Sequence, residues 1–139
     1  MRNFLGDTAR AMSQENVERV RNSLDAYRRG DYDAASACLA PNVVWEVGQE
    51  LPAHGPEAVR DLWKRWDNEW EELETVADEI LDAGDKVVLA MRYRGRGRGS
   101  GIEVSDRLFE VHTFRDGQCV SKVDFANRSE ALEAAGLSD

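Results

Sequence analysis

Three side chains that could carry out acid–base chemistry fall within one short stretch of the chain, residues 108–125. Glu110 and His112 lie two positions apart, and Asp124 follows beyond a turn sequence at residues 115–117. A carboxyl group in an apolar pocket keeps its proton to a higher pH than in water. Two carboxyl groups in unequal surroundings can divide into one base and one acid. We expect Asp124 to accept a proton, Glu110 to donate one to a substrate oxygen, and His112 to be a second donor or an orienting group.

The turn between the two strands decides whether these side chains meet. Residues 115–117, with the sequence Arg-Asp-Gly, can form a three-residue loop, a type I turn followed by a left-handed glycine. That loop places on one face the residues Glu110, His112, Val120, Lys122 and Asp124. A two-residue loop at Asp116 and Gly117 would instead set Asp124 opposite Phe109, away from Glu110. The sequence favours the three-residue loop.

The direction of that face has a serious alternative. The opposite face is more cleanly apolar and could itself form the core; it holds Phe109, Val111, Cys119, Val123 and Phe125. In that arrangement Glu110 and Asp124 would be ordinary solvated charges. For His112 the alternative is a structural histidine bonded to a backbone group or a carboxylate.

Helical patterns occupy the first half of the chain. Ser13 is a good N-cap for an amphipathic helix that Gly30 ends. The apolar stripe of this helix is formed by Val17, Val20, Leu24 and Tyr27. A short second helix is expected from Asp31 to Pro41, followed by a strand at residues 43–47. A third helix begins at Pro56, with His54 at its start and an apolar stripe of Val59, Leu62, Trp63, Trp66 and Trp70.

Strand patterns follow to near the end of the chain. We expect strands at residues 72–82, 87–98, 102–114 and 118–126, and a closing helix at 129–135. Helices first and strands afterwards indicate an α+β fold. The short turns between the late strands imply antiparallel pairing. A long curved sheet with three helices laid across it would enclose a space.

Composition excludes several classes of partner. The net charge of −9 argues against nonspecific binding of nucleic acid or of an anionic membrane, and no apolar run approaches membrane-spanning length. The arginine–glycine run at residues 94–99 is shorter than RNA-binding segments of that type. The two cysteines, Cys38 and Cys119, indicate a reducing, cytoplasmic location. Neither His54 nor His112 has metal-ligand spacing, so no metal and no cofactor is expected.

Five segments together resemble the nuclear transport factor two-like superfamily, in its SnoaL-like branch, which includes polyketide cyclases and ketosteroid isomerase. Their order and spacing carry the resemblance. They are residues 27–33 (YRRGDYD), 54–60 (HGPEAVR), 82–88 (DAGDKVV), 113–117 (TFRDG) and 130–137 (EALEAAGL). The resemblance implies a cone-shaped α+β barrel of the cystatin-like or ketosteroid isomerase-like type, with a curved antiparallel sheet and three N-terminal helices packed on it. It covers residues 13–139 as one domain and leaves 1–12 as a flexible extension.

The resemblance also implies a pocket at the wide end of the sheet and a homodimer built across it. Glu110, His112 and Asp124 would then face the pocket. The other residues expected to line it are Trp45, Tyr93, Trp63, Phe114 and Tyr27, with Gly95 and Gly97 leaving room for a flat ligand.

Neither known catalytic set of the superfamily carries over in full. The isomerase base falls near Val47, which cannot take a proton, while its second acid matches Glu110. The epoxide hydrolase acid matches Asp124, but its partners fall on Met91 and Tyr93. The expected function is therefore binding of a small apolar organic ligand, with cofactor-independent isomerisation, cyclisation or hydration of it. The alternative is a noncatalytic binding protein or structural dimer of the same fold.

Overall fold

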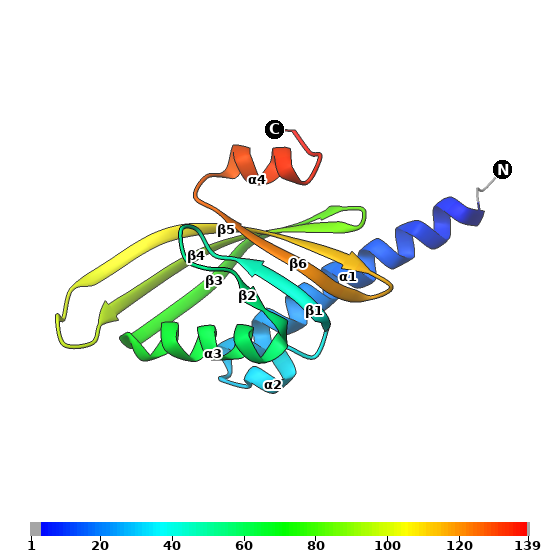
Figure 1. The fold of residues 1–139 in the computed structure, drawn as a ribbon. Helices are drawn as coiled ribbons and strands as arrows, with labels where there is room; N and C mark the ends of the chain where they lie inside the picture. The colour runs from blue at the N-terminus through cyan, green and yellow to red at the C-terminus, as the bar shows by residue number, and fades with distance from the viewer. Residues whose placement is uncertain (1–3, 139) are drawn as a thin grey trace.

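The computed structural model describes residues 4–138, which form helices on both faces of a six-stranded sheet (Figure 1). The helices are α1 (Phe4–Arg28), α2 (Tyr32–Ala35), α3 (Gly55–Asn68) and α4 (Arg128–Ala134). The strands are β1 (Leu39–Glu46), β2 (Ala53–His54), β3 (Trp70–Ala83), β4 (Lys86–Gly97), β5 (Glu103–Arg115) and β6 (Gln118–Phe125). The predicted α+β class is confirmed.

The sheet is curved and open, with the strand order β2-β1-β6-β5-β4-β3. Neighbouring strands pair antiparallel, as predicted, except that β1 and β6 run parallel. This parallel pair joins the first strand of the chain to the last, so β1, which follows α2 in the chain, lies beside β6 in the sheet.

Successive side chains of β4 point to opposite faces of the sheet and pack into two separate cores. Val87, Leu89 and Met91 pack in the main core, together with apolar residues of α1, β1 and α3. Val88 and Ala90 face the other way, into a smaller core. Helix α4 covers this smaller core, on the face of the sheet opposite to α1 and α3 (Figure 1).

Helix α1 starts much earlier than the sequence indicated. The predicted extension of little structure is helical from Phe4, and Ser13 lies inside the helix rather than capping it. The single hydroxyl proton of Ser13 is shared between two acceptors, the Arg10 carbonyl oxygen and Oδ2 of Asp82, each 2.9 Å from Oγ. Bonding back to the carbonyl three residues earlier allows a serine to sit within a helix. Ser13 thus fixes α1 to the end of β3.

Two other boundaries differ from the prediction. Helix α2 ends at Ala35, and Pro41 lies within β1 instead of stopping the helix. The proline is tolerated because the pairing of β1 with β6 is irregular between Leu39 and Val44. Helix α3 ends at Asn68, so Trp70 belongs to β3 rather than to the helix stripe.

No helix in residues 4–138 combines the length and the apolar character needed to cross a bilayer.

Candidate active site

The β5–β6 hairpin brings the three predicted catalytic side chains together. Its turn is a two-residue one, in which Asp116 and Gly117 both have positive φ, 51° and 78°, and Arg115 pairs with Gln118. Asp-Gly is a favoured sequence for a turn of this kind. The predicted three-residue loop is therefore wrong.

A β-bulge restores the alignment that a two-residue turn would have lost. Phe114 pairs with Cys119, but Thr113 pairs with Ser121, so Val120 is an extra residue on β6. Beyond the bulge, Glu110 lies directly opposite Asp124. His112 likewise lies opposite Lys122. The bulge also turns Cys119 toward the main core, which corrects its predicted place on the opposite face.

These side chains line a cavity of about 550 Å³ between the sheet and the helices α1 and α3. Ligand sites typically have volumes of about 300–1,000 Å³. Most of the wall is apolar, and it includes Val20, Leu24, Leu62, Leu89, Met91 and Leu108. The polar lining residues from the last two strands are Glu110, His112, Lys122 and Asp124, together with the exposed Asp106 and Arg107.

The opposite, apolar face of the hairpin is buried as well, as the alternative prediction required. Phe109 and Val111 are buried in the smaller core beneath α4. Both faces of β5 are therefore buried along this part of the strand, and the ionisable face is the one that looks into the cavity.

Glu110 is a buried carboxylate held by two neighbours. It is 5% exposed, and its Oε1 lies 2.8 Å from Nε2 of His112 and 3.9 Å from Nζ of Lys122. Burial by itself raises the pKa of Glu110, but the Lys122 charge and the hydrogen bond from His112 outweigh it, and the net pKa lies below the ordinary value. Glu110 is thus an anion at neutral pH, which argues against the protonated donor expected from the sequence.

His112 is the hydrogen-bond donor to this anion. Burial lowers the pKa of His112, although the Glu110 charge acts in the opposite direction. The imidazole is then neutral, and because the Glu110 carboxylate can only accept, Nε2 carries the proton. His112 therefore orients Glu110.

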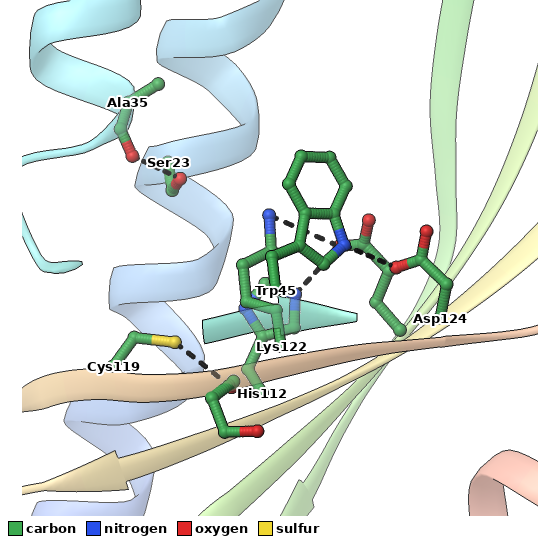
Figure 2. Close-up of polar contacts among 9 residues, drawn as sticks. Ser23, Ala35, Trp45, His112, Cys119, Lys122 and Asp124 are labelled. Carbon is green, nitrogen blue, oxygen red and sulfur yellow. Dashed lines mark hydrogen bonds and ion pairs between the residues drawn. The ribbon is translucent and has the colours of Figure 1, made fainter. Parts of the chain in front are cut away.

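Asp124 is the carboxyl group whose surroundings favour protonation. Burial and the nearby Glu110 charge raise the pKa of Asp124 to about 7, although the Trp45 hydrogen bond and Lys122 act against the rise. Nε1 of Trp45 donates to Oδ1 of Asp124 over 2.8 Å (Figure 2). Within residues 4–138, Oδ2 of Asp124 has no hydrogen-bond partner. The group can therefore exchange a proton with a molecule in the cavity at neutral pH.

Lys122 is a polar residue of this site to which the sequence assigned no role. It is 4% exposed, and its Nζ lies 4.1 Å from the ring centroid of Trp45 and 5.0 Å from that of Trp63. Figure 2 shows the lysine beside the Trp45 indole, with Asp124 on the other side of that ring. The alternation of β6 places Lys122 on the same face as Asp124, and this was the only signal in the sequence.

Aromatic side chains hold the helix side of the cavity in place. The hydroxyl groups of Tyr27 and Tyr32 both donate to the carboxylate of Asp67 on α3. Burial and this hydrogen bond raise the pKa of Tyr32 to about 12 and raise that of Tyr27 as well. The two phenols therefore stay protonated and link α1 and α2 to α3. The Tyr27 ring also packs on Trp63, with centroids 5.8 Å apart.

Four of the five residues predicted to line the pocket do so. Tyr27, Trp45, Trp63 and Tyr93 line the cavity. Phe114 does not: it is buried in the main core, beyond the cavity wall.

The glycines of β4 do not make room for a ligand, contrary to the prediction. A Cβ at Gly95 would lie 2.5 Å from the Trp70 ring, so that indole fills the space. At Gly97 the nearest atom is Oγ of Ser100, at 2.6 Å.

Among residues 4–138, no three histidine, cysteine or carboxylate side chains gather in a way that could hold a metal ion. His54 caps α3 through its backbone and does not line the cavity.

The sequence matches the model of a family described as SnoaL-like domain over residues 20–122. No curated protein matches it closely enough to indicate a relationship.

Several proteins of known structure have the same fold as this chain. A putative SnoaL-like polyketide cyclase from Jannaschia sp. CCS1 is 23% identical, with 81% of this chain and 85% of that chain covered and a TM-score of 0.74. A protein with a ketosteroid isomerase-like fold from Catenulispora acidiphila, in complex with trimethylamine, is 20% identical (86% and 93% covered, TM-score 0.70). An epoxide hydrolase of the LEH-like type from M. tuberculosis is 19% identical (82% and 84% covered, TM-score 0.68). At these identities the likeness shows the fold alone.

Proposed function

This chain belongs to the SnoaL-like domain family, and we propose that it binds a small, largely apolar organic molecule in its cavity and transfers a proton on that molecule through Asp124. The chemistry would be a cofactor-independent isomerisation, cyclisation or hydration. Support for ligand binding comes from the volume and apolar lining of the cavity. The complex of the Catenulispora protein with trimethylamine is consistent with small-molecule binding on this fold.

The observation that carries the catalytic part is the environment of Asp124. A general base works best when its pKa lies near the working pH, and burial beside Glu110 raises the pKa of Asp124 to about 7. As a carboxylate, Asp124 would take a proton from a carbon next to a substrate carbonyl. As the resulting acid, it would return the proton to a different atom of the same molecule.

Glu110 has a different part in this proposal from the one the sequence suggested. It keeps its negative charge through Lys122 and His112, and that charge contributes to the raised pKa of Asp124. Glu110 is then a positioning and tuning group, and Asp124 alone exchanges the proton.

Hydrogen–deuterium exchange on a simple ketone tests this proposal without knowledge of the natural substrate. The probe is β-tetralone, a bicyclic ketone with acidic CH₂ protons, in deuterated buffer near neutral pH, followed by proton NMR. We expect the protein to accelerate exchange above the buffer rate. Asp124→Asn should remove most of the acceleration, because a positioned base contributes about 10²–10⁴-fold.

The matched control is Asp61→Asn, which removes an exposed carboxylate on α3 and should leave the rate unchanged. Binding of the ketone without accelerated exchange would support a noncatalytic binding protein instead. Equal rates for the unmodified protein and Asp124→Asn would reject Asp124 as the base.

A further inference from the structure

Lys122 is a buried cation in the cavity wall. Two arginines, Arg65 and Arg107, also line the cavity, but both are exposed. Among the residues that the structure describes, Lys122 is therefore the only lysine or arginine that contacts the cavity from a buried position. A charged side chain is almost never fully buried unless it is paired, so its partners indicate what the site is built to hold.

The protein satisfies this ammonium group only in part. Nζ carries three N–H donors, yet it has no hydrogen-bond partner within residues 4–138. Its nearest carboxylate oxygen, Oε1 of Glu110, is 3.9 Å away, and that oxygen already accepts from His112 at 2.8 Å. The faces of Trp45 and Trp63 hold the cation in place without accepting a conventional hydrogen bond.

The same indole ring connects Lys122 with the proposed base. The Trp45 ring lies against Nζ of Lys122, while its Nε1 bonds Asp124. Lys122 and Asp124 therefore contact the same indole and line the same cavity, whose apolar wall includes Leu24, Leu89 and Met91.

The two carboxyl groups nearest Lys122 are less available to a cationic ligand, and the other three that line the cavity, Glu50, Glu69 and Asp106, are exposed to solvent. Glu110 is engaged by His112 and lies beside Lys122, and Oδ1 of Asp124 is engaged by Trp45. The ammonium of Lys122 would repel a second cation brought to the same place. The unsatisfied donors of Lys122 instead match an oxygen that carries negative charge, since hydrogen bonds between charged groups are the strong ones.

We propose that the ligand of this cavity is an apolar organic acid whose carboxylate or enolate oxygen accepts a hydrogen bond from Nζ of Lys122. This inference rests on the proposed function in so far as the cavity binds a small molecule, but it does not require that Asp124 be catalytic.

Three ligands with one ring system and three charges test the inference. They are β-naphthoate, its neutral analogue β-naphthamide, and the cation β-naphthylmethylammonium, and their affinities are measured by isothermal titration calorimetry at neutral pH. We expect the unmodified protein to bind the naphthoate at least about tenfold more tightly than the naphthamide, as a hydrogen bond between charged groups allows. The ammonium compound should bind most weakly.

The double variant Lys122→Met with Glu110→Gln assigns the preference to Lys122. Replacing both charges avoids leaving Glu110 buried without its cation, and we expect the naphthoate and the naphthamide to bind within about threefold of each other. Arg107→Met, which removes an exposed cation of the cavity wall, is the matched control and should keep the preference. Circular dichroism verifies the fold of each variant, and the three-ligand comparison on the unmodified protein stands without them.

The outcomes separate this inference from the proposed function. Naphthamide binding as tightly as naphthoate, or the ammonium compound binding most tightly, would overturn the organic-acid inference while ligand binding stands. A preference for naphthoate that survives in the double variant would overturn the role of Lys122. Absence of binding for all three ligands would contradict ligand binding itself, and the inference with it.

Discussion

Glu110 and Asp124 face each other across the β5–β6 pair, yet their pKa values are shifted in opposite directions. Glu110 lies beside Lys122 and accepts from His112, so its pKa is lowered although the side chain is buried. Asp124 receives one hydrogen bond, from Trp45, and experiences the charge of Glu110, so its pKa is raised. Glu110 is buried and Asp124 is partly buried, so the opposite shifts come from the partner that each side chain reaches.

The raised pKa of Asp124 has a consequence for stability. Its folded-state pKa of about 7 lies above the ordinary value of 3.8, so the folded protein binds the proton more tightly than the unfolded chain. Stability from this group is fully present below about pH 4 and is lost as the pH rises to about 7. Glu110, with a lowered pKa, acts with the opposite sign and only at acidic pH.

We therefore expect Asp124→Asn to be more stable than the unmodified protein at pH 8, by about 1–3 kcal/mol. An asparagine can still accept the hydrogen bond from Trp45 and has no buried charge to stabilise. Urea denaturation at several pH values measures the difference, which should shrink toward pH 4. A variant that is no more stable at pH 8, or a gap that does not change with pH, would contradict the raised pKa.

The candidate residues could be found from the sequence, but their roles could not. Strand alternation was enough to group Glu110, His112 and Asp124. It gave no means to tell which carboxyl group would stay ionised. That depends on the 3.9 Å approach of Lys122 to Glu110 and on the hydrogen bond from Trp45, whose strand is far from β6 in the sequence but beside it in the sheet. Phe114 has the aromatic character of a pocket residue, and only its place in the fold shows that it belongs to the core.

At the scale of elements, the β5–β6 hairpin places Glu110, His112 and Asp124 on one face as predicted, although the predicted turn is wrong. The Asp-Gly pair forms a two-residue turn, which alone would have set Asp124 opposite Phe109. The extra residue Val120 shifts the register back by one position. Nothing in the local sequence marks Val120 as a bulge, because a valine suits a regular strand equally well.

The hairpin of β3 and β4 offers a test of packing beside the cavity. Neither Gly95 nor Gly97 has positive φ, and only Gly95 meets a rigid neighbour, since its Cβ would lie 2.5 Å from the Trp70 ring and 2.9 Å from the Glu72 carbonyl oxygen. At Gly97 the close atom is the end of the exposed Ser100 side chain.

We expect Gly95→Ala to lower the free energy of unfolding by about 1–3 kcal/mol, because overpacking forces the indole or the backbone to move. It should also change the tryptophan fluorescence, since Trp70 packs against Trp66 and Tyr93. Gly97→Ala is the matched control and should stay close to the unmodified protein in both measurements. Equal effects of the two substitutions would show that Trp70 does not fill the space at Gly95.

At the scale of the whole molecule, helices pack on both faces of the curved sheet, and the cavity lies between the sheet and helices α1 and α3. Helices α1 and α3 cover one face and α4 the other (Figure 1), so the ionisable side chains of β5 and β6 are shielded from solvent on the cavity side. The order of helices and strands was predictable from periodicity. The parallel pairing of β1 with β6 was not, because it joins segments some eighty positions apart, such as Leu39 and Cys119. The homodimer, the cytoplasmic location and the absence of nucleic-acid binding stay predictions.

Asp124 is a partly buried carboxyl group at the cavity, and we expect it to titrate near neutral pH. A ¹³C NMR titration of the aspartate carboxyl carbons measures this directly, with the Asp124 signal assigned by its loss in Asp124→Asn. We expect a midpoint near pH 7 for that signal. A midpoint near the ordinary value of about 3.9 would contradict it, because Asp124 would then be a solvated carboxylate with no special capacity to exchange a proton.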